Sequence, residues 1–490
     1  MNVILNISNK LITNNHLNFL VLFLLVFLTQ FSSINIEVID WDESTFYIIS
    51  KYVSNGDILY QDYWDGKPPI IFFYLGLVFK LFGPSLLVGR LAGDFVIFLT
   101  IVMIYKILNI FYQTRTCFFT SLFLIFLYSY DASQPTMTEH LGIFFIVASI
   151  YLVFKKSSNK NLFYIGVLFS LAFNTRNNLA FACVAIAIYL LYINKVGVNN
   201  FIYLILGFLS VILAISFYFI INKSLKNYFY MLLEFPFQTT QSYRMNLDEF
   251  LIQITSKFNL EQKLNVEISI IILIIFLIFF VVFTFSKQLN KDLFILNSLV
   301  SFFIALSIVF GGRLFNHYLI QLFPFISIYF AFLLNVKKKF AFNFILYAFA
   351  VLLNLGLINK GLNNINNYQI IKNDYVIQNI SKEIKISDET TKFLALENHL
   401  IFFYNDMIKP FKVVHPSGLP NTTRNQKIFA SLKKLNIVKD NEFRNFLDAK
   451  PDYIFCEKEC NQYIKQEFFE NYYTLLIEKN NLKLFQKNKY

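Results

Sequence analysis

Three acidic side chains stand directly after the first long apolar run of the sequence. LNFLVLFLLVFLTQF occupies residues 17–31, and the following INIEVIDWDES places Asp40, Asp42 and Glu43 close together. Carboxylates in this position can take a proton from a hydroxyl or amine nucleophile. They equally suit the start of a helix, where a capping residue and acids in the first turn are stabilising. The sequence by itself leaves both interpretations open.

Other polar residues have types that suit the same chemistry. Lys and Arg bind phosphate, Lys as a point charge and Arg through a bidentate fork. The further candidates are Asp62, Asp65 and Lys67 in QDYWDGKPP, Asp131, Glu139 and His140 in DASQPTMTEH, Arg176 in NTRNN, and Arg313 and His317 in GGRLFNHY. Ordinary alternatives exist for most of them, such as loop acids, a helix-capping Glu139, or a satisfied interfacial histidine rather than a metal ligand at His317.

The elements that must position these side chains are membrane helices. Of the 490 residues, 56% are hydrophobic and only 15% are charged, whereas soluble domains are about 25% charged. Many apolar segments approach or exceed the ~18 residues that indicate a spanning helix. We predict eleven spans, at residues 14–33, 86–111, 117–130, 140–154, 161–174, 178–194, 201–221, 266–286, 293–310, 318–335 and 340–358.

The charge of the loops predicts how these spans are oriented. The Lys-rich connections are KKSSNK, KQLNK and KKK, and they fall on one side together with Arg115 and Lys195. The positive-inside rule therefore places the N-terminus in the cytoplasm and the acidic loops outside. Arg176 and Arg313 then lie in outer loops, where the positive-inside rule disfavours basic residues. A role in setting topology therefore does not explain them. The Lys clusters also account for the net charge of +12, so nucleic-acid binding is not favoured.

The apolar segment PPIIFFYLGLVFKLFG, residues 68–83, is not counted as a span. Counting it would move every later Lys cluster to the outside, and Lys80 interrupts it. We predict an interfacial or re-entrant helix within a first outer loop, residues 34–85. That loop also holds DESTFYIISKYVSNG, which predicts an amphipathic helix ended by Gly56.

Two further segments are predicted outside the membrane. Residues 222–265 mix aromatic and charged side chains, and residues 359–490 form a polar tail long enough for a small α/β domain. In the tail, TKFLALENHLIFFY and PDYIFC suggest buried strands, and SKEI and NQKIFASLKKL suggest helices. For CEKEC the sequence leaves open a disulfide between Cys456 and Cys460.

Carboxylates and cations on one membrane face suit group transfer from a lipid-linked phosphate to an acceptor. The attack would resemble that of an inverting glycosidase, with the acceptor in place of water. The alternative is a transporter or flippase of lipid-linked saccharides. Such proteins usually place ionisable residues near the midplane of paired repeats, and the sequence shows no repeat.

WDESTFYIISKYVSNGDILYQDYWDGKPPIIFFYLGLVFKLFGPSLLVGRLAG resembles the first outer loop of the GT-C glycosyltransferases. The branch is that of the protein O-mannosyltransferases and the lipid A aminoarabinose transferase. The shared features are an acidic pair after the first span, a K-P-P step, and an FG turn before an Arg. PTMTEHLGIFF resembles the second acidic site of this family, and GGRLFNHYLIQLFPF resembles its late Arg-containing segment.

This resemblance implies roles for the candidate residues. Asp42 would be the catalytic base, with Glu43 supporting it and Asp40 only a solvated flank. Lys67 would contact the donor phosphate, and Glu139 would be the second acidic site, orienting sugar or acceptor or holding a metal. Arg313 and His317 would bind the polyprenyl phosphate, and the remaining substrate-binding candidates are Arg176, Asp65 and His140.

One position departs from the family pattern. The aminoarabinose transferases commonly carry Glu immediately before the Lys, where this sequence has Gly66 with Asp65 one residue earlier. No cofactor is certain as a result, and a divalent metal stays open. The tail shows no sugar-binding MIR-type domain, so a bacterial-type enzyme of the inner membrane is favoured over the eukaryotic subtype.

The fold expected from these observations is an all-α polytopic membrane protein with a small C-terminal α/β domain. Residues 1–358 would form the GT-C catalytic domain, and residues 359–490 an extracytoplasmic domain. The expected partners are a polyprenyl-phosphate-sugar donor, a lipid, glycan or protein acceptor, and membrane lipids, but no nucleic acid. The active site would face the outside, on the same side as the C-terminal domain.

Overall fold

The computed structural model consists of two compact units, each built from several stretches of the chain. It describes residues 14–129, 136–155, 158–192, 196–243, 290–311, 315–335, 340–384, 391–405, 410–416, 426–457 and 460–488. The first unit comprises residues 1–33, 90–215 and 243–365, and the second comprises residues 34–89, 216–242 and 366–490. The predicted span 266–286 and the candidates Asp131 and Arg313 lie outside the described residues.

The first unit is a helical bundle. Its helices are α2 (Asn15–Gln30), α5 (Leu86–Leu108, from residue 90), α6 (Thr114–Tyr128), α7 (Thr138–Val153), α8 (Asn159–Phe173), α9 (Ala180–Tyr192), α10 (Phe201–Ile221, to residue 215), α15 (Lys291–Phe310), α16 (Phe323–Leu334) and α17 (Phe340–Asn366, to residue 365). Every predicted span within the described residues coincides with one of these helices. Only α17 runs clearly beyond its predicted end.

Six helical segments of the described chain are long and apolar enough to cross a membrane. They are Asn15–Ser33, Leu86–Leu108, Val198–Ile221, Lys291–Phe310, His317–Leu334 and Phe344–Asn366. Shorter apolar helices occupy Thr114–Tyr128, Thr138–Val153 and Asn177–Tyr192, together with Ile70–Phe82, the segment predicted not to span. This mostly helical, apolar architecture confirms the polytopic membrane protein expected from the sequence.

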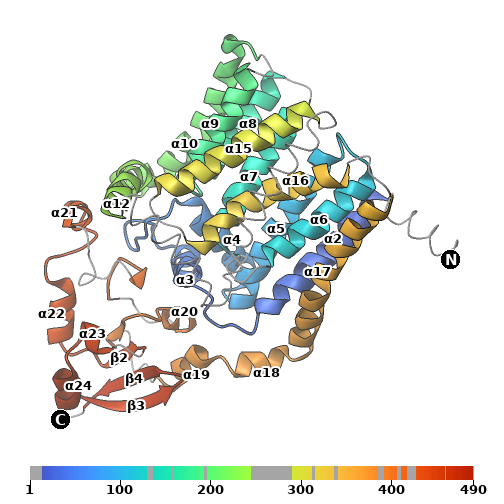
Figure 1. The fold of residues 1–490 in the computed structure, drawn as a ribbon. Helices are drawn as coiled ribbons and strands as arrows, with labels where there is room; N and C mark the ends of the chain where they lie inside the picture. Colours follow the sequence, from blue (N-terminus) through green and yellow to red (C-terminus); the bar gives the residue numbers. More distant parts are fainter. Residues whose placement is uncertain are drawn as a thin grey trace. The chain divides into compact units, whose positions relative to one another are not determined.

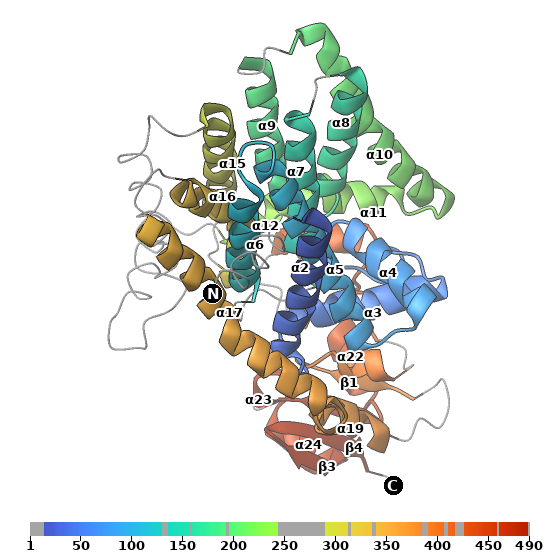
Figure 2. The ribbon, with the colours of Figure 1, turned by 90° about the vertical axis from the view of Figure 1, so that its right-hand side faces the viewer.

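Two glycines allow the close packing of α8 against α10. A Cβ atom on Gly166 would lie 1.9 Å from the carbonyl oxygen of Leu204, and one on Gly207 would lie 1.9 Å from that of Phe163. Small residues at such crossings let helix backbones approach where no water drives association. Figure 2 shows α7, α8 and α9 side by side in this bundle.

The second unit begins with two packed helices, α3 (Trp41–Asn55) and α4 (Ile70–Phe82), which lie side by side in Figure 1. Gly56 ends α3 in a left-handed conformation with φ of 108°, as predicted. The predicted helix is present, but it has no exposed polar face along most of its length, because residues 42–52 are all buried. Both α4 and α20 (Ile401–Tyr404) pack against it, so most of its circumference is covered.

Short helices and a small sheet complete the second unit. The helices are α11 (Leu225–Phe229), the π-helical turn Tyr230–Glu234, α12 (Phe235–Tyr243, to residue 242), α18 (Tyr368–Asn373), α19 (Val376–Glu383), α21 (Gln426–Lys434), α22 (Glu442–Asp448), α23 (Cys460–Tyr463) and α24 (Gln466–Tyr472). The strands are β1 (Phe393–Ala395), β2 (Tyr453–Cys456), β3 (Tyr473–Lys479) and β4 (Leu482–Lys487), in the order β1-β2-β4-β3. β1 pairs with β2 in parallel, and the other pairs are antiparallel.

One predicted strand is much shorter than expected. Only Phe393–Ala395 of TKFLALENHLIFFY is extended, and the segment from Ile401 onward forms α20. Beyond the strand, the side chain of Glu397 accepts a hydrogen bond from the backbone N–H of Glu457 at 3.0 Å. The sequence PDYIFC, in contrast, holds strand β2 as predicted, and Cys456 and Cys460 form a disulfide.

The chain that follows the first span packs with the C-terminal part of the chain, so the predicted boundary between residues 1–358 and 359–490 does not separate the two units of the structure. Both carboxylate oxygens of Glu37 accept backbone hydrogen bonds at the start of α19, from Ile377 at 2.9 Å and Gln378 at 2.8 Å. Burial nevertheless raises the pKa of the Glu37 carboxyl, against the lowering effect of these bonds. Residues 34–40 therefore form part of the same unit as the tail.

Candidate active site

The acidic residues after the first span make different contacts. Asp40 caps α3 by accepting a hydrogen bond from the backbone N–H of Asp42 at 2.7 Å, so its interpretation as a solvated flank is wrong. Because Asp40 supplies the cap, the Asp42 side chain is available for other contacts. The capping interpretation is confirmed for Asp40, and the catalytic interpretation of Asp42 stays a prediction.

Asp42 lies between two basic side chains. Its Oδ2 atom is 2.7 Å from Nζ of Lys67, and its Oδ1 atom is 3.2 Å from Nε2 of His415. Lys67 comes from the loop before α4, and His415 comes from the C-terminal domain, so three distant parts of one unit meet at this carboxylate. The side chain of Asp42 keeps 13% of its surface exposed, which leaves it accessible to a small reactant.

Asp65 is a second carboxyl group beside this cluster. It is 5% exposed, and burial raises its pKa, an effect opposed by the nearby His415 and Lys67 and enhanced by Asp42. Within the described part of the chain, its Oδ2 atom has no hydrogen-bond partner. The interpretation of Asp65 as an ordinary loop acid is therefore wrong. Asp62 is an ordinary loop acid, because it accepts a hydrogen bond from the backbone of Ile58 at 2.8 Å.

The ring of Phe235 explains why position 66 holds a glycine. A Cβ atom at this position would lie 2.2 Å from the ring of Phe235, which packs edge-on against Trp64 at a centroid distance of 4.9 Å. An aromatic ring thus occupies the space that a side chain at position 66 would need. Among the described residues, no group of three or more His, Cys, Asp or Glu side chains has the arrangement of a metal site.

Glu43, the residue after Asp42, forms a hydrogen bond with Tyr47. Its Oε1 atom accepts a hydrogen bond from the hydroxyl of Tyr47 at 3.0 Å, one turn along α3. The Tyr47 ring in turn fills the space above Gly89, where a Cβ atom would lie 2.4 Å away. Through Tyr47, Glu43 therefore contributes to the packing of α3.

Two histidines of this unit were not identified from the sequence. His415 lies in KVVHPSG, which has no acidic neighbour, and its contact with Asp42 joins positions 373 residues apart in the chain. His399 lies nearby, with Nε2 2.8 Å from the hydroxyl of Thr45 and its ring centroid 6.3 Å from that of His415. Only the fold brings these residues to α3.

The first unit holds a separate buried cluster around Glu139. The Nη1 atom of Arg176 lies 2.8 Å from Oε1 of Glu139, and Nε2 of His317 lies 3.7 Å from the same oxygen. Thr138 bridges the pair, donating to Glu139 at 3.0 Å and accepting from Arg176 at 3.0 Å. The guanidinium group also stacks over the Tyr318 ring at 4.6 Å. Three of the predicted site residues therefore meet here.

The ring of His140 packs against an aromatic side chain. Its side chain is buried, and its ring packs against that of Tyr128 at a centroid distance of 4.9 Å. It is adjacent in sequence to Glu139, but its ring contact is with the aromatic core rather than with Arg176. This environment is that of a packing residue.

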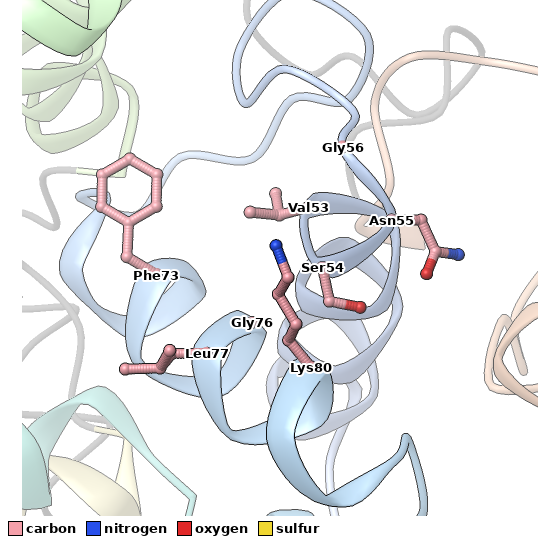
Figure 3. Close-up of a pocket in the computed structure, with 8 residues that line it drawn as sticks. All are labelled: Val53, Ser54, Asn55, Gly56, Phe73, Gly76, Leu77 and Lys80. Atoms are coloured by element: carbon pink, nitrogen blue, oxygen red, sulfur yellow. The ribbon is translucent and has the colours of Figure 1, made fainter.

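A pocket of about 240 Å³ lies between α3 and α4, lined by Val53, Ser54, Asn55, Gly56, Phe73, Gly76, Leu77 and Lys80 (Figure 3). It lies at the C-terminal end of α3, whereas Asp42 lies in the first turn. At 1.5 Å per residue, these positions are about 16 Å apart along the helix. The pocket is thus separate from the Asp42 cluster.

Comparison with known proteins agrees with this architecture. Residues 66–220 match the family described as dolichyl-phosphate-mannose-protein mannosyltransferase. The fold is similar to that of ArnT from Cupriavidus metallidurans bound to undecaprenyl phosphate, with a TM-score of 0.62 at 12% identity, over 95% of this chain and 97% of that chain. The Archaeoglobus fulgidus oligosaccharyltransferase, in a structure with Zn and sulfate, gives a TM-score of 0.43 at 12% identity, over 94% of this chain and 73% of that chain.

No curated protein sequence matches the chain. The family match covers the loop with Lys67 and the helices that follow it, as far as residue 220. The likeness to ArnT extends the agreement in fold over almost the whole length. The sequence match over residues 66–220 and the fold shared with ArnT both agree with the membrane glycosyltransferase expected from the sequence.

Proposed function

We propose that this protein transfers a sugar from a polyprenyl-monophosphate carrier to a lipid, glycan or protein acceptor on the outer face of the membrane. The observation that carries the proposal is the contact of 2.7 Å between Asp42 and Lys67. It joins a proton acceptor and a phosphate-binding cation in one partly exposed cluster. The ArnT structure was obtained with undecaprenyl phosphate, which is the chemical class proposed here for the donor's leaving group.

The proposed reaction is a single displacement. Asp42 takes the proton from the acceptor hydroxyl or amine, whose oxygen or nitrogen forms a bond to the anomeric carbon of the sugar. The bond from that carbon to the phosphate oxygen breaks, and the electron pair leaves with the polyprenyl phosphate. Since the phosphate leaves as a stable anion, it needs no strong acid, and attack from the opposite face inverts the anomeric centre.

Lys67 would change partners during this reaction. In the structure its ammonium group neutralises Asp42, but a donor phosphate carries more charge and offers several acceptor oxygens. Binding of the donor would draw Lys67 toward the phosphate and leave Asp42 more basic. Asp65 would retain Lys67 near the site through its own negative charge.

We assign the Glu139 cluster to the orientation of sugar or acceptor. Glu139 is fully buried and paired with Arg176, so its carboxylate is held in one position. Arg313 is proposed to bind the carrier phosphate with His317. The proposed location is a bacterial inner membrane, with the active site and the C-terminal domain outside, and the Cys456–Cys460 disulfide supports an oxidising compartment for that domain.

The test compares cells that lack the gene with the same cells carrying wild-type or variant protein. Mass spectrometry of glycolipids and glycoproteins should find a glycosylated product that wild type restores. Asp42→Asn should reduce its formation by about 10²- to 10⁴-fold. Asp62→Asn is the matched control and should restore it, because Asp62 only accepts a loop hydrogen bond.

Two outcomes would contradict the proposal. Asp42→Asn protein that is inserted in the membrane and restores the product fully would show that this carboxylate is not the base. Movement of an intact lipid-linked saccharide across liposome membranes, with no transfer of its sugar, would indicate a flippase.

A further inference from the structure

His415 reaches Asp42 through a short backbone pairing. The backbone N–H of Trp64 donates to the carbonyl of Lys412 at 2.8 Å, and that of Val414 donates to the carbonyl of Trp64 at 3.1 Å. This pairing aligns the C-terminal segment with the loop that carries Asp65 and Lys67. The C-terminal domain thus contributes a titratable side chain directly to the proposed base.

The contact constrains the protonation of the imidazole. Nε2 of His415 lies 3.2 Å from Oδ1 of Asp42, and because a carboxylate can only accept a hydrogen bond, an imidazole that orients it carries a proton on Nε2. The ring is then either the neutral Nε2–H tautomer or the imidazolium. The neutral ring orients Asp42, whereas the imidazolium adds a second positive charge to a carboxylate that already contacts Lys67.

Several ionisable groups face His415. Asp42 on α3 and Asp65 in the loop before α4 are acidic, and Lys67 of the same loop is basic. His399 precedes α20, and Trp41 on α3 presents its ring edge-on at a centroid distance of 6.2 Å. Among the groups around Asp42, His415 is the one whose residue type commonly exchanges a proton near neutral pH.

We propose that His415 is a positioning residue that makes the basicity of Asp42 depend on pH. The neutral imidazole holds the carboxylate ready to accept the proton of the acceptor. The imidazolium lowers the affinity of Asp42 for that proton and stops transfer. This inference rests on the proposed function, since it assigns Asp42 as the base.

The first experiment needs no substrate. The chain has two tryptophans, Trp41 and Trp64, and Trp64→Phe leaves Trp41 as the reporter beside His415. Imidazolium quenches indole fluorescence, so emission of the purified protein in detergent should rise as pH increases through the titration of the imidazole. His415→Gln, which keeps an N–H donor, should abolish this step.

Two matched variants make that result specific. His16→Gln alters an exposed histidine of the first unit and should keep the fluorescence step. His399→Gln should also keep it. A step that survives His415→Gln, a step that disappears with His399→Gln instead, or a flat titration of the Trp64→Phe parent would overturn the assignment.

The second experiment measures transfer as a function of pH. Membranes of the deletion strain, which hold the endogenous donor and acceptor, are supplied with each purified variant between pH 5 and 9. Wild-type transfer should fall on the acid side within the range where imidazole titrates. His415→Gln should shift that acid limb down by about 1 pH unit or more, whereas His415→Ala should lower the plateau about 10- to 100-fold.

The Asp42→Asn variant separates the two proposals in the same assay. Transfer by Asp42→Asn at the wild-type rate would overturn the proposed function. An inactive Asp42→Asn together with a wild-type acid limb in His415→Gln would overturn only the role of His415. Size-exclusion profiles identify any variant that fails to fold, and His415→Asn then replaces His415→Gln.

Discussion

The ammonium group of Lys67 lies 2.7 Å from the carboxylate of Asp42, so the proposed phosphate ligand and the proposed base form an ion pair. Such a pair leaves the carboxylate weakly basic while its cation stays in place. A donor that competes for the Lys would activate the base as it binds. Donor binding and base activation are therefore coupled in the arrangement we propose.

The first prediction concerns this ion pair. Lys67→Ala should raise KM for the donor about 10- to 100-fold, because a charge-assisted contact to phosphate is worth about 1.5–3 kcal/mol. Lys67→Arg should recover part of the loss. Steady-state kinetics with varied donor concentration measures both. An unchanged donor KM in Lys67→Ala would exclude a phosphate role for this residue.

The second prediction concerns the buried Asp65. Burial raises its pKa above the ordinary 3.8, so the folded protein binds a proton more tightly than the unfolded chain. Wild-type stability should therefore fall as pH rises from the ordinary value through the raised one. Asp65→Asn should remove this slope and melt at the same or a higher temperature at neutral pH.

Thermal unfolding in detergent at several pH values checks the effect of Asp65→Asn, with Asp62→Asn as the control from the same loop. A wild-type pH slope that persists in Asp65→Asn would show that another group causes it. Transfer activity of Asp65→Asn should fall even where stability rises, because Lys67 loses a nearby opposite charge.

The third prediction concerns the glycine before Lys67. Gly66→Ala should destabilise the protein by about 1–3 kcal/mol, because its Cβ would overlap the Phe235 ring. Phe235→Ala should relieve that overlap, so the double variant should be less affected than the two single effects added together. Chemical denaturation of all three variants measures the coupling, and strict additivity would contradict the steric explanation.

The fourth prediction concerns the buried Glu139–Arg176 pair. Arg176→Ala should cost about 3–5 kcal/mol, because it removes the closest cation from a buried carboxylate. Adding Glu139→Gln should restore part of this stability by removing the buried charge. Thermal unfolding checks both variants, and Lys160→Ala on the exposed start of α8 serves as the control. A small loss in Arg176→Ala would show that other groups neutralise Glu139.

The helical framework could be predicted because it depends on local composition. Long apolar runs must form helices in a membrane, where every backbone polar group needs an internal partner. The end of α3 was equally local, since Gly56 adopts a left-handed conformation that other residues disfavour. The segment that begins at Ile401 was predicted wrongly, because its apolar pattern fits a strand as well as a short buried helix.

The sequence by itself determined the membrane class and the two helices of the segment that follows the first span. It also singled out Asp42 and Lys67, whose contact the structure contains. Only the tertiary structure decided that Asp40 is the cap, that Phe235 fills the space beside Gly66, and that His415 contacts Asp42. The physical reason is that these contacts join positions far apart in the chain or depend on which neighbouring oxygen turns inward. The spacing and composition of the sequence reveal neither the long-range contacts nor the orientation of these oxygens.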